Sequence, residues 1–139
     1  MKPQIKIGLV IGIIGLILNA CISTFGRISW GPIIYLLIGG LASFSAVRRE
    51  KPNNKQDGAR AGAVAGSVAG ILVTFGQFIG AILILLAPPT AAEIATPGLS
   101  TQIGYQVGQA TSTAVCIGFP LALITGVLIG YLMTSKQKE

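Results

Sequence analysis

The sequence predicts an all-α, polytopic membrane protein with four transmembrane helices and both termini in the cytoplasm. Two observations support this fold class. The 139 residues are 52% hydrophobic and only 10% charged, a composition too apolar for a soluble domain. The basic residues also gather in three clusters that alternate with four apolar runs. Because Lys and Arg are enriched in cytoplasmic loops, this alternation indicates which end of each run faces inward.

The four apolar runs set the expected boundaries of a single domain. A helix needs about 20 apolar residues to cross the hydrocarbon of a bilayer, and a lone strand would leave its backbone groups unpaired there. We expect helices at about 7–25, 30–47, 61–87 and 113–133, a cytoplasmic loop at 48–60 and an external loop at 88–112. Asp57 is positioned to cap the third helix, and Pro120 should kink the fourth.

Two segments permit alternatives. Residues 99–112 space Ile103, Val107 and Ala110 at helical intervals, so they either lie on the outer surface or extend the fourth helix outward. The first run ends in Leu18-Asn19-Ala20-Cys21, which is similar to a lipoprotein signal peptide with Cys21 as the lipidated residue. Asn19 fits that cleavage site poorly, so we expect an ordinary, uncleaved first helix.

The largest basic cluster lies between the second and third runs. It consists of Arg48, Arg49, Lys51, Lys55 and Arg60. The net charge of +6 is confined to the expected cytoplasmic ends, so we expect the lipid bilayer as a partner and no nucleic acid. The cluster acts as a topology determinant, or alternatively as a surface for anionic lipid head groups.

Small residues at helical spacing are the strongest internal pattern. The glycines expected to form helix-packing faces are Gly8, Gly12, Gly15, Gly62, Gly66, Gly70, Gly76, Gly80, Gly126 and Gly130. In lipid, helices associate mainly through close van der Waals contact, which small residues permit. One interpretation is that these faces hold the four helices of one subunit together. The alternative is that at least one of them meets another subunit, with Gly62–Gly70 as the first candidate.

The residue types that are missing from the sequence narrow the function. The chain contains no His, the commonest general base and metal ligand, and no charged residue within the expected spans. We therefore expect no catalytic residue, cofactor or metal site, and no enzyme activity. Cys21 and Cys116 are expected to be packing residues, with a disulfide as the alternative. Asn19, Thr74 and Gln77 are the main polar residues in the spans; they either join helices by hydrogen bonds or line a pore.

The stretch DGARAGAVAG at residues 57–66 leads into the expected third helix, with its repeated glycines. This stretch starts with an acidic residue, a glycine, a small residue and a basic residue in succession. Over residues 39–80 the chain resembles small, Gly/Ala-rich four-helix membrane protein families of prokaryotes that have no assigned function. The resemblance implies the four-helix topology and carries over no binding residue. We expect a multi-pass protein of the cell membrane that serves as a non-catalytic structural or accessory subunit in a homo-oligomer or a larger membrane complex. The alternative is a small oligomeric channel or passive transporter.

Overall fold

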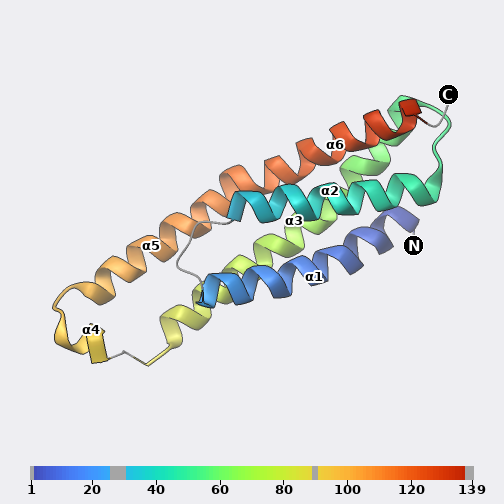
Figure 1. Ribbon diagram of the computed structural model, residues 1–139. Helices are drawn as coiled ribbons and strands as arrows, with labels where there is room; N and C mark the ends of the chain where they lie inside the picture. Colours follow the sequence, from blue (N-terminus) through green and yellow to red (C-terminus); the bar gives the residue numbers. More distant parts are fainter. Residues whose placement is uncertain (1, 26–30, 89–90, 137–139) are drawn as a thin grey trace.

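The computed structural model describes residues 2–25, 31–88 and 91–136, and over these ranges the fold is all-α (Figure 1). The helices are α1 (Pro3–Phe25), α2 (Gly31–Glu50), α3 (Lys55–Leu86), the short α4 (Ala91–Ala95), α5 (Leu99–Thr113) and α6 (Phe119–Lys136). A single π-helical turn, η1 (Ala114–Gly118), joins α5 to α6. The expected start of the second helix at residue 30 lies outside the described residues.

The third helix begins earlier than expected, at Lys55 instead of residue 61. The expected cap at Asp57 is wrong. Asn54 is the N-cap, and its side-chain oxygen accepts a hydrogen bond of 2.7 Å from the Asp57 backbone N–H. Asp57 instead lies in the first turn of the helix, where a carboxylate interacts favourably with the helix dipole. The polar residues 55–60 therefore add a turn and a half to the apolar run.

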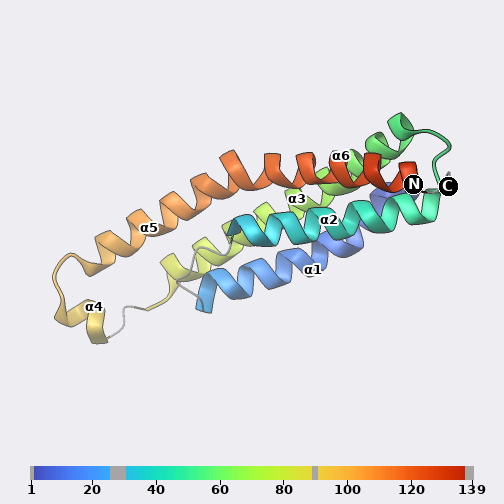
Figure 2. The ribbon, with the colours of Figure 1, turned by 45° about the horizontal axis from the view of Figure 1, so that its top comes forward.

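The segment 99–112 extends the fourth helix. Helix α5 runs through η1 into α6, so that Leu99–Thr134 forms one continuous apolar helix of 36 residues. Pro120 has no backbone N–H to donate to the preceding turn. The π-helical turn lies just before it, as is common where a helix accommodates a local irregularity. Figure 2 shows the change of direction between α5 and α6.

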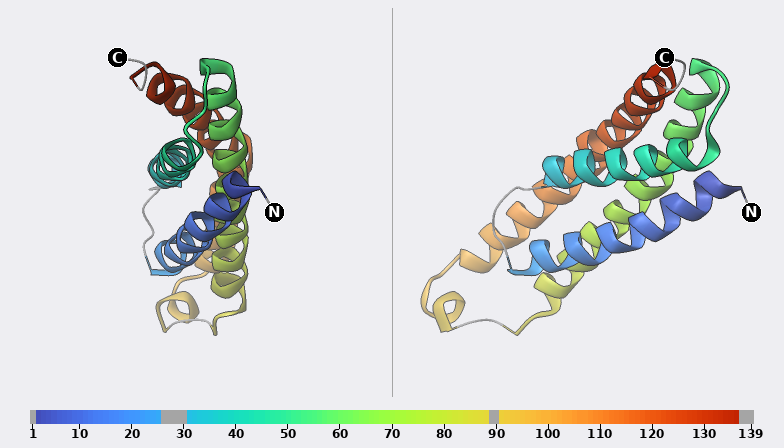
Figure 3. Two further views of the ribbon diagram at one scale, coloured as in Figure 1. Left: turned by 90° about the vertical axis from the view of Figure 1, so that its right-hand side faces the viewer. Right: turned by 45° about the vertical axis from the view of Figure 1, so that its right-hand side comes forward.

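Helices α2 and α3 form the middle of the bundle, because each contacts both α1 and α6. The start of α1, the end of α6 and the connection between α2 and α3 lie at one end of the molecule, whereas α4 and α5 project from the other (Figures 1 and 3). The described basic residues outside the spans therefore share one end with both chain termini.

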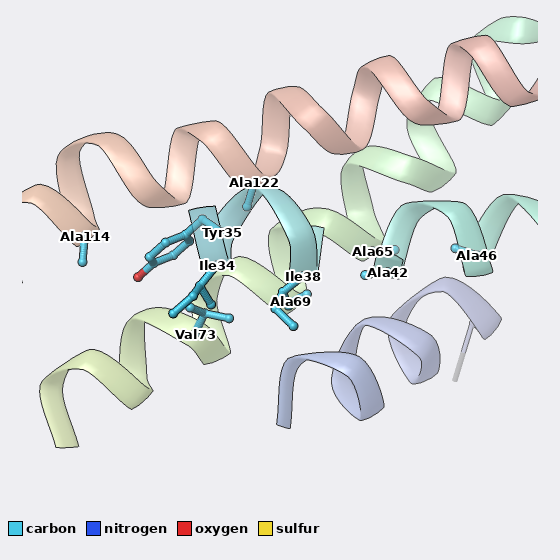
Figure 4. Close-up of a cluster of buried hydrophobic side chains, with 10 residues drawn as sticks. All are labelled: Ile34, Tyr35, Ile38, Ala42, Ala46, Ala65, Ala69, Val73, Ala114 and Ala122. Atoms are coloured by element: carbon cyan, nitrogen blue, oxygen red, sulfur yellow. The ribbon is translucent and has the colours of Figure 1, made fainter. Parts of the chain in front are cut away.

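The core consists mostly of small side chains. The buried cluster drawn in Figure 4 comprises Ile34, Tyr35, Ile38, Ala42, Ala46, Ala65, Ala69, Val73, Ala114 and Ala122. Large apolar side chains lie outside, with Val10, Leu37 and Leu85 about 60% exposed. A soluble domain buries such side chains, whereas a bundle in lipid places small residues between its helices.

Within the part of the chain that the structure describes, three helices are long and apolar enough to cross a membrane by length and composition: α1, α3 and the continuous helix of α5, η1 and α6. Helix α2, whose last turn carries Arg48 and Arg49, is not among them. The chain is consistent with a helical membrane protein.

Candidate functional site: glycine interfaces, a buried polar cluster and a basic end

The closest helix contact joins α3 and α6 through two facing stripes of small residues. On α3, Gly58, Gly62, Gly66 and Gly70 repeat every four residues; on α6, Ala122, Gly126 and Gly130 do so. A Cβ atom placed on Gly62 would overlap the carbonyl oxygen of Gly126, and one on Gly66 would lie 2.8 Å from that of Ala122. For the Gly62–Gly70 face the structure favours the first of the two alternatives, contact within one subunit, since α6 of the same chain covers it.

A hydroxyl group lies where three helices meet at this contact. Ser43 of α2 donates its hydrogen to both the Gly39 and the Gly62 carbonyl oxygens, each at 2.8 Å. Its side chain is fully buried. A Cβ on Gly126 would lie 2.9 Å from the same hydroxyl oxygen. Helices α2, α3 and α6 thus meet at a point where no additional methyl group fits.

A second glycine interface joins α1 to α3. Gly8 faces the Ala65 carbonyl oxygen, at 2.9 Å from a hypothetical Cβ, and Gly12 faces Ala69 at 3.0 Å. Gly15 faces both Val73 of α3 and Ile38 of α2. In the opposite sense, a Cβ on Gly76 would overlap the backbone of Leu16 on α1, and Gly80 is buried as well. The predicted packing glycines Gly8, Gly12, Gly15 and Gly76 therefore lie at contacts within one chain.

The three polar residues singled out in the spans form two neighbouring hydrogen-bonded groups. The Asn19 amide nitrogen of α1 donates to the Val73 carbonyl at 2.9 Å and to the Gln77 side-chain oxygen at 3.3 Å. The Tyr35 hydroxyl lies 2.9 Å from the Thr74 hydroxyl. Thr74 also donates to the Gly70 carbonyl at 2.9 Å, and either hydroxyl can be the donor in the bond between Tyr35 and Thr74.

This polar cluster joins helices and is closed to solvent. Asn19 is 1% exposed and Gln77 is 9% exposed. Within the described residues every buried side-chain polar atom has a hydrogen-bond partner. The arrangement accounts for these residues as bonds between α1, α2 and α3. It leaves Gln77 turned into the subunit, so the channel alternative has no lining residue at this position.

The predicted basic residues all lie on the surface at the end that carries the termini. Arg48, Arg49, Lys51, Lys55 and Arg60 are exposed. The Lys55 ammonium lies 5.0 Å from the centre of the Tyr131 ring, a cation–π contact that ties the start of α3 to α6. A cavity of about 700 Å³ lies beside them, between the beginning of α1, the end of α2 and the first turns of α3.

Several contacts were not anticipated from the sequence. Gly58 continues the four-residue spacing of the α3 stripe by one step and was missed because the helix was expected to begin at residue 61. Gly118, in the π-helical turn, lies against the Tyr35 ring, which a Cβ would approach to 2.6 Å. The Gln4 amide donates to the Glu50 carboxylate, linking α1 to α2. Neither the ring contact nor this bond has a sequence signal.

The described residues contain no group of three or more His, Cys, Asp or Glu residues placed to hold a metal ion. Cys21 and Cys116 are both free and exposed, so the alternative of a disulfide between them is wrong, and so is their expected role in packing. No family model, no curated protein and no solved structure matches the chain.

Proposed function

We propose that the chain is a four-crossing protein of a prokaryotic cell membrane, with both termini in the cytoplasm, that acts as a non-catalytic accessory subunit. Its partner is either further copies of itself or a larger membrane complex. Since the glycine faces of the bundle are filled within the chain, the proposed contact surface is the outward extension α5.

The position of the termini supports the proposed topology. The start of α1 and the end of α6 share an end with the connection between α2 and α3 (Figure 3). Lys2, Lys6 and the five exposed cations of the middle cluster lie at this same end, and positive charge favours the cytoplasmic side. Helix α2 is proposed as the fourth crossing because it lies within the bundle and directs Leu37 and Leu41 outward.

The observation that carries the accessory role is the exposure of α5. This helix has 15 residues and none of them is buried. Gly104 and Gly108 have nothing within 4 Å of a hypothetical Cβ, in contrast to the packed glycines of the bundle. Helix α5 continues α6 in one helix of 36 residues, yet the rest of the chain buries none of its side chains. Contact with a second protein would cover the side chains of α5 that this chain leaves unburied.

Reporter fusions test the topology. Green fluorescent protein fused to the C-terminus should fluoresce, and alkaline phosphatase inserted near Gly98 should be active, because that enzyme folds only outside the cytoplasm. Fusions placed between α2 and α3, near Asn53, should behave like the C-terminal fusion. Phosphatase activity at the C-terminus would contradict the proposal.

Native mass spectrometry of the protein extracted from its own membranes tests the accessory role. We expect co-purification at a fixed ratio with other copies or with larger subunits. Replacing Gly104 and Gly108 by Leu should abolish it. Replacing Gln102 and Gln106 by Leu is the matched control, since these exposed residues lie on the opposite side of α5. A lone monomer, or equal loss of the partner in both variants, would refute the proposed surface.

A further inference from the structure

The cavity at the basic end has the chemical features of a lipid head-group site. It has a volume of about 700 Å³ and is lined by residues from α1, from the connection between α2 and α3, and from α3. Three cations line it: Lys2, Lys51 and Arg60. None of the three side chains forms an ion pair with a carboxylate in the part of the chain that the structure describes. Their charges are thus available to a ligand.

The two carboxylates of the lining set the kind of head group. Glu50 accepts a hydrogen bond from Gln4, and Asp57 lies in the first turn of α3. With three cations and two carboxylates, the lining has a net charge of +1. The cations suit a phosphate, and the carboxylates suit hydroxyl groups that donate hydrogen bonds. A phosphoglycerol group offers both.

The apolar part of the lining favours a lipid over a free anion. Ile5 and Val64 line the cavity together with Pro52 and Ala61. Ile5 and Val64 lie farther along α1 and α3 toward the apolar middle of the bundle than Lys2 and Arg60 do. An amphiphile would thus place its phosphate among the cations and its glycerol and first acyl carbons against these two side chains.

The backbone at Lys51 supports a role for that side chain. Lys51 has a φ of 47°, the only positive value among described non-glycine residues, and its N–H donates to the Val47 carbonyl at 2.9 Å. This left-handed position ends a helix and is usually taken by Gly or Asn. A lysine there is conformationally costly, and its position places an ammonium group in the cavity wall.

We propose that this cavity binds the head group of an anionic phospholipid of the phosphatidylglycerol type at the cytoplasmic surface. The test uses full-length protein in non-ionic detergent at about 0.15 M salt, where charges beyond roughly 8 Å are screened. Binding of phosphatidylglycerol is measured by native mass spectrometry. Phosphatidylethanolamine and phosphatidylcholine with identical acyl chains serve as comparison probes. We expect phosphatidylglycerol to bind in preference to both.

The double variant Lys51→Gln with Arg60→Gln should weaken phosphatidylglycerol binding about 30-fold, since each cation near a lipid head group contributes roughly equally to the attraction. Arg48→Gln with Arg49→Gln removes the same charge from the same end but from residues outside the cavity lining. This control should weaken binding much less than the Lys51 and Arg60 variant, because its side chains do not line the cavity. Lys51→Arg with Arg60→Lys should retain binding, because both charges remain.

Equal weakening by the two charge-removing pairs would overturn the proposal in favour of general surface attraction. Equal binding of the three lipids to the unmodified protein would also overturn it, and this comparison requires no variant to fold. Displacement of the lipid by inorganic phosphate alone would refute the lipid assignment and indicate a soluble phosphate ligand. Helix content by circular dichroism confirms that each variant is folded.

Discussion

Gly126→Ala tests whether the contact between α3 and α6 limits the stability of the bundle. A Cβ on Gly126 would lie 2.6 Å from the Gly62 carbonyl oxygen and 2.9 Å from the Ser43 hydroxyl oxygen, whereas ordinary contact begins at 3.4 Å. The shortfall to the carbonyl is thus 3.4 − 2.6 = 0.8 Å. Neither neighbour can move easily, because one is helix backbone and the other is held by two hydrogen bonds. The helices must separate.

The expected effect follows from three contributions. Overpacking a well-packed site costs about 1–3 kcal/mol. Weakening the Ser43 bond between helices adds about 0.6 kcal/mol, and the higher helix propensity of Ala returns about 1 kcal/mol. We therefore expect Gly126→Ala to lower the free energy of unfolding by about 0.5–2.5 kcal/mol.

The matched control is Gly104→Ala, which makes the same chemical change where a Cβ meets nothing within 4 Å. It should leave stability unchanged or raise it by up to about 1 kcal/mol. Since the propensity gain is common to both variants, their difference isolates the packing penalty. The measurement is loss of helicity during titration of detergent-solubilised protein with dodecyl sulfate. Equal stability of the two variants would refute the reasoning.

Three further substitutions test smaller contributions by the same titration. Asn19→Leu should destabilise the bundle by about 1 kcal/mol, because it removes two hydrogen bonds between α1 and α3 at roughly 0.6 kcal/mol each; no change would mean that the cluster contributes nothing. Tyr35→Phe removes a single bond to Thr74 and should cost about 0.6 kcal/mol or less, so a loss larger than that of Asn19→Leu would contradict the assignment. Asn54→Ala removes the cap of α3 and should cost about 1 kcal/mol; faster amide exchange confined to the first turn of α3 would locate the effect, and unchanged exchange would argue against it.

The helices could be predicted from the sequence because apolar runs and basic clusters both report on the bilayer. The beginning of α3 was missed because residues 55–60 are polar, and hydropathy does not detect a helix that continues beyond the lipid. Its cap is at Asn54. The choice between a surface helix and an extended helix at 99–112 could not be made either. The spacing of Ile103 and Val107 is the same in both arrangements.

The packing glycines could be recognised from the sequence, but their partners could not. A four-residue spacing identifies one face of a helix, yet Gly62 would have the same spacing whether α6 or another subunit lay against it. The facing stripe on α6 distinguishes these two cases. Whether α6 lies against α3 depends on the order of the helices around the bundle. A hydrogen bond from the Asn19 side chain could be predicted, because a buried amide requires a partner. That the partner is Gln77 could not be predicted, because many partners are possible.

Helix lengths separate the two proposed contact surfaces. At 1.5 Å per residue, the 18 residues of α6 span about 27 Å, close to the roughly 30 Å of a bilayer core. With the basic end at the cytoplasmic surface, the π-helical turn falls near the outer boundary and α5 extends about 22 Å beyond it. Under the proposed topology, the proposed partner surface lies outside the cell membrane and the proposed lipid cavity on its inner side. Leu at Gly104 and Gly108 should leave phosphatidylglycerol binding unchanged, and Lys51→Gln with Arg60→Gln should leave partner co-purification unchanged. A variant at either end that abolished both properties would show that the two surfaces are one functional unit, against this separation.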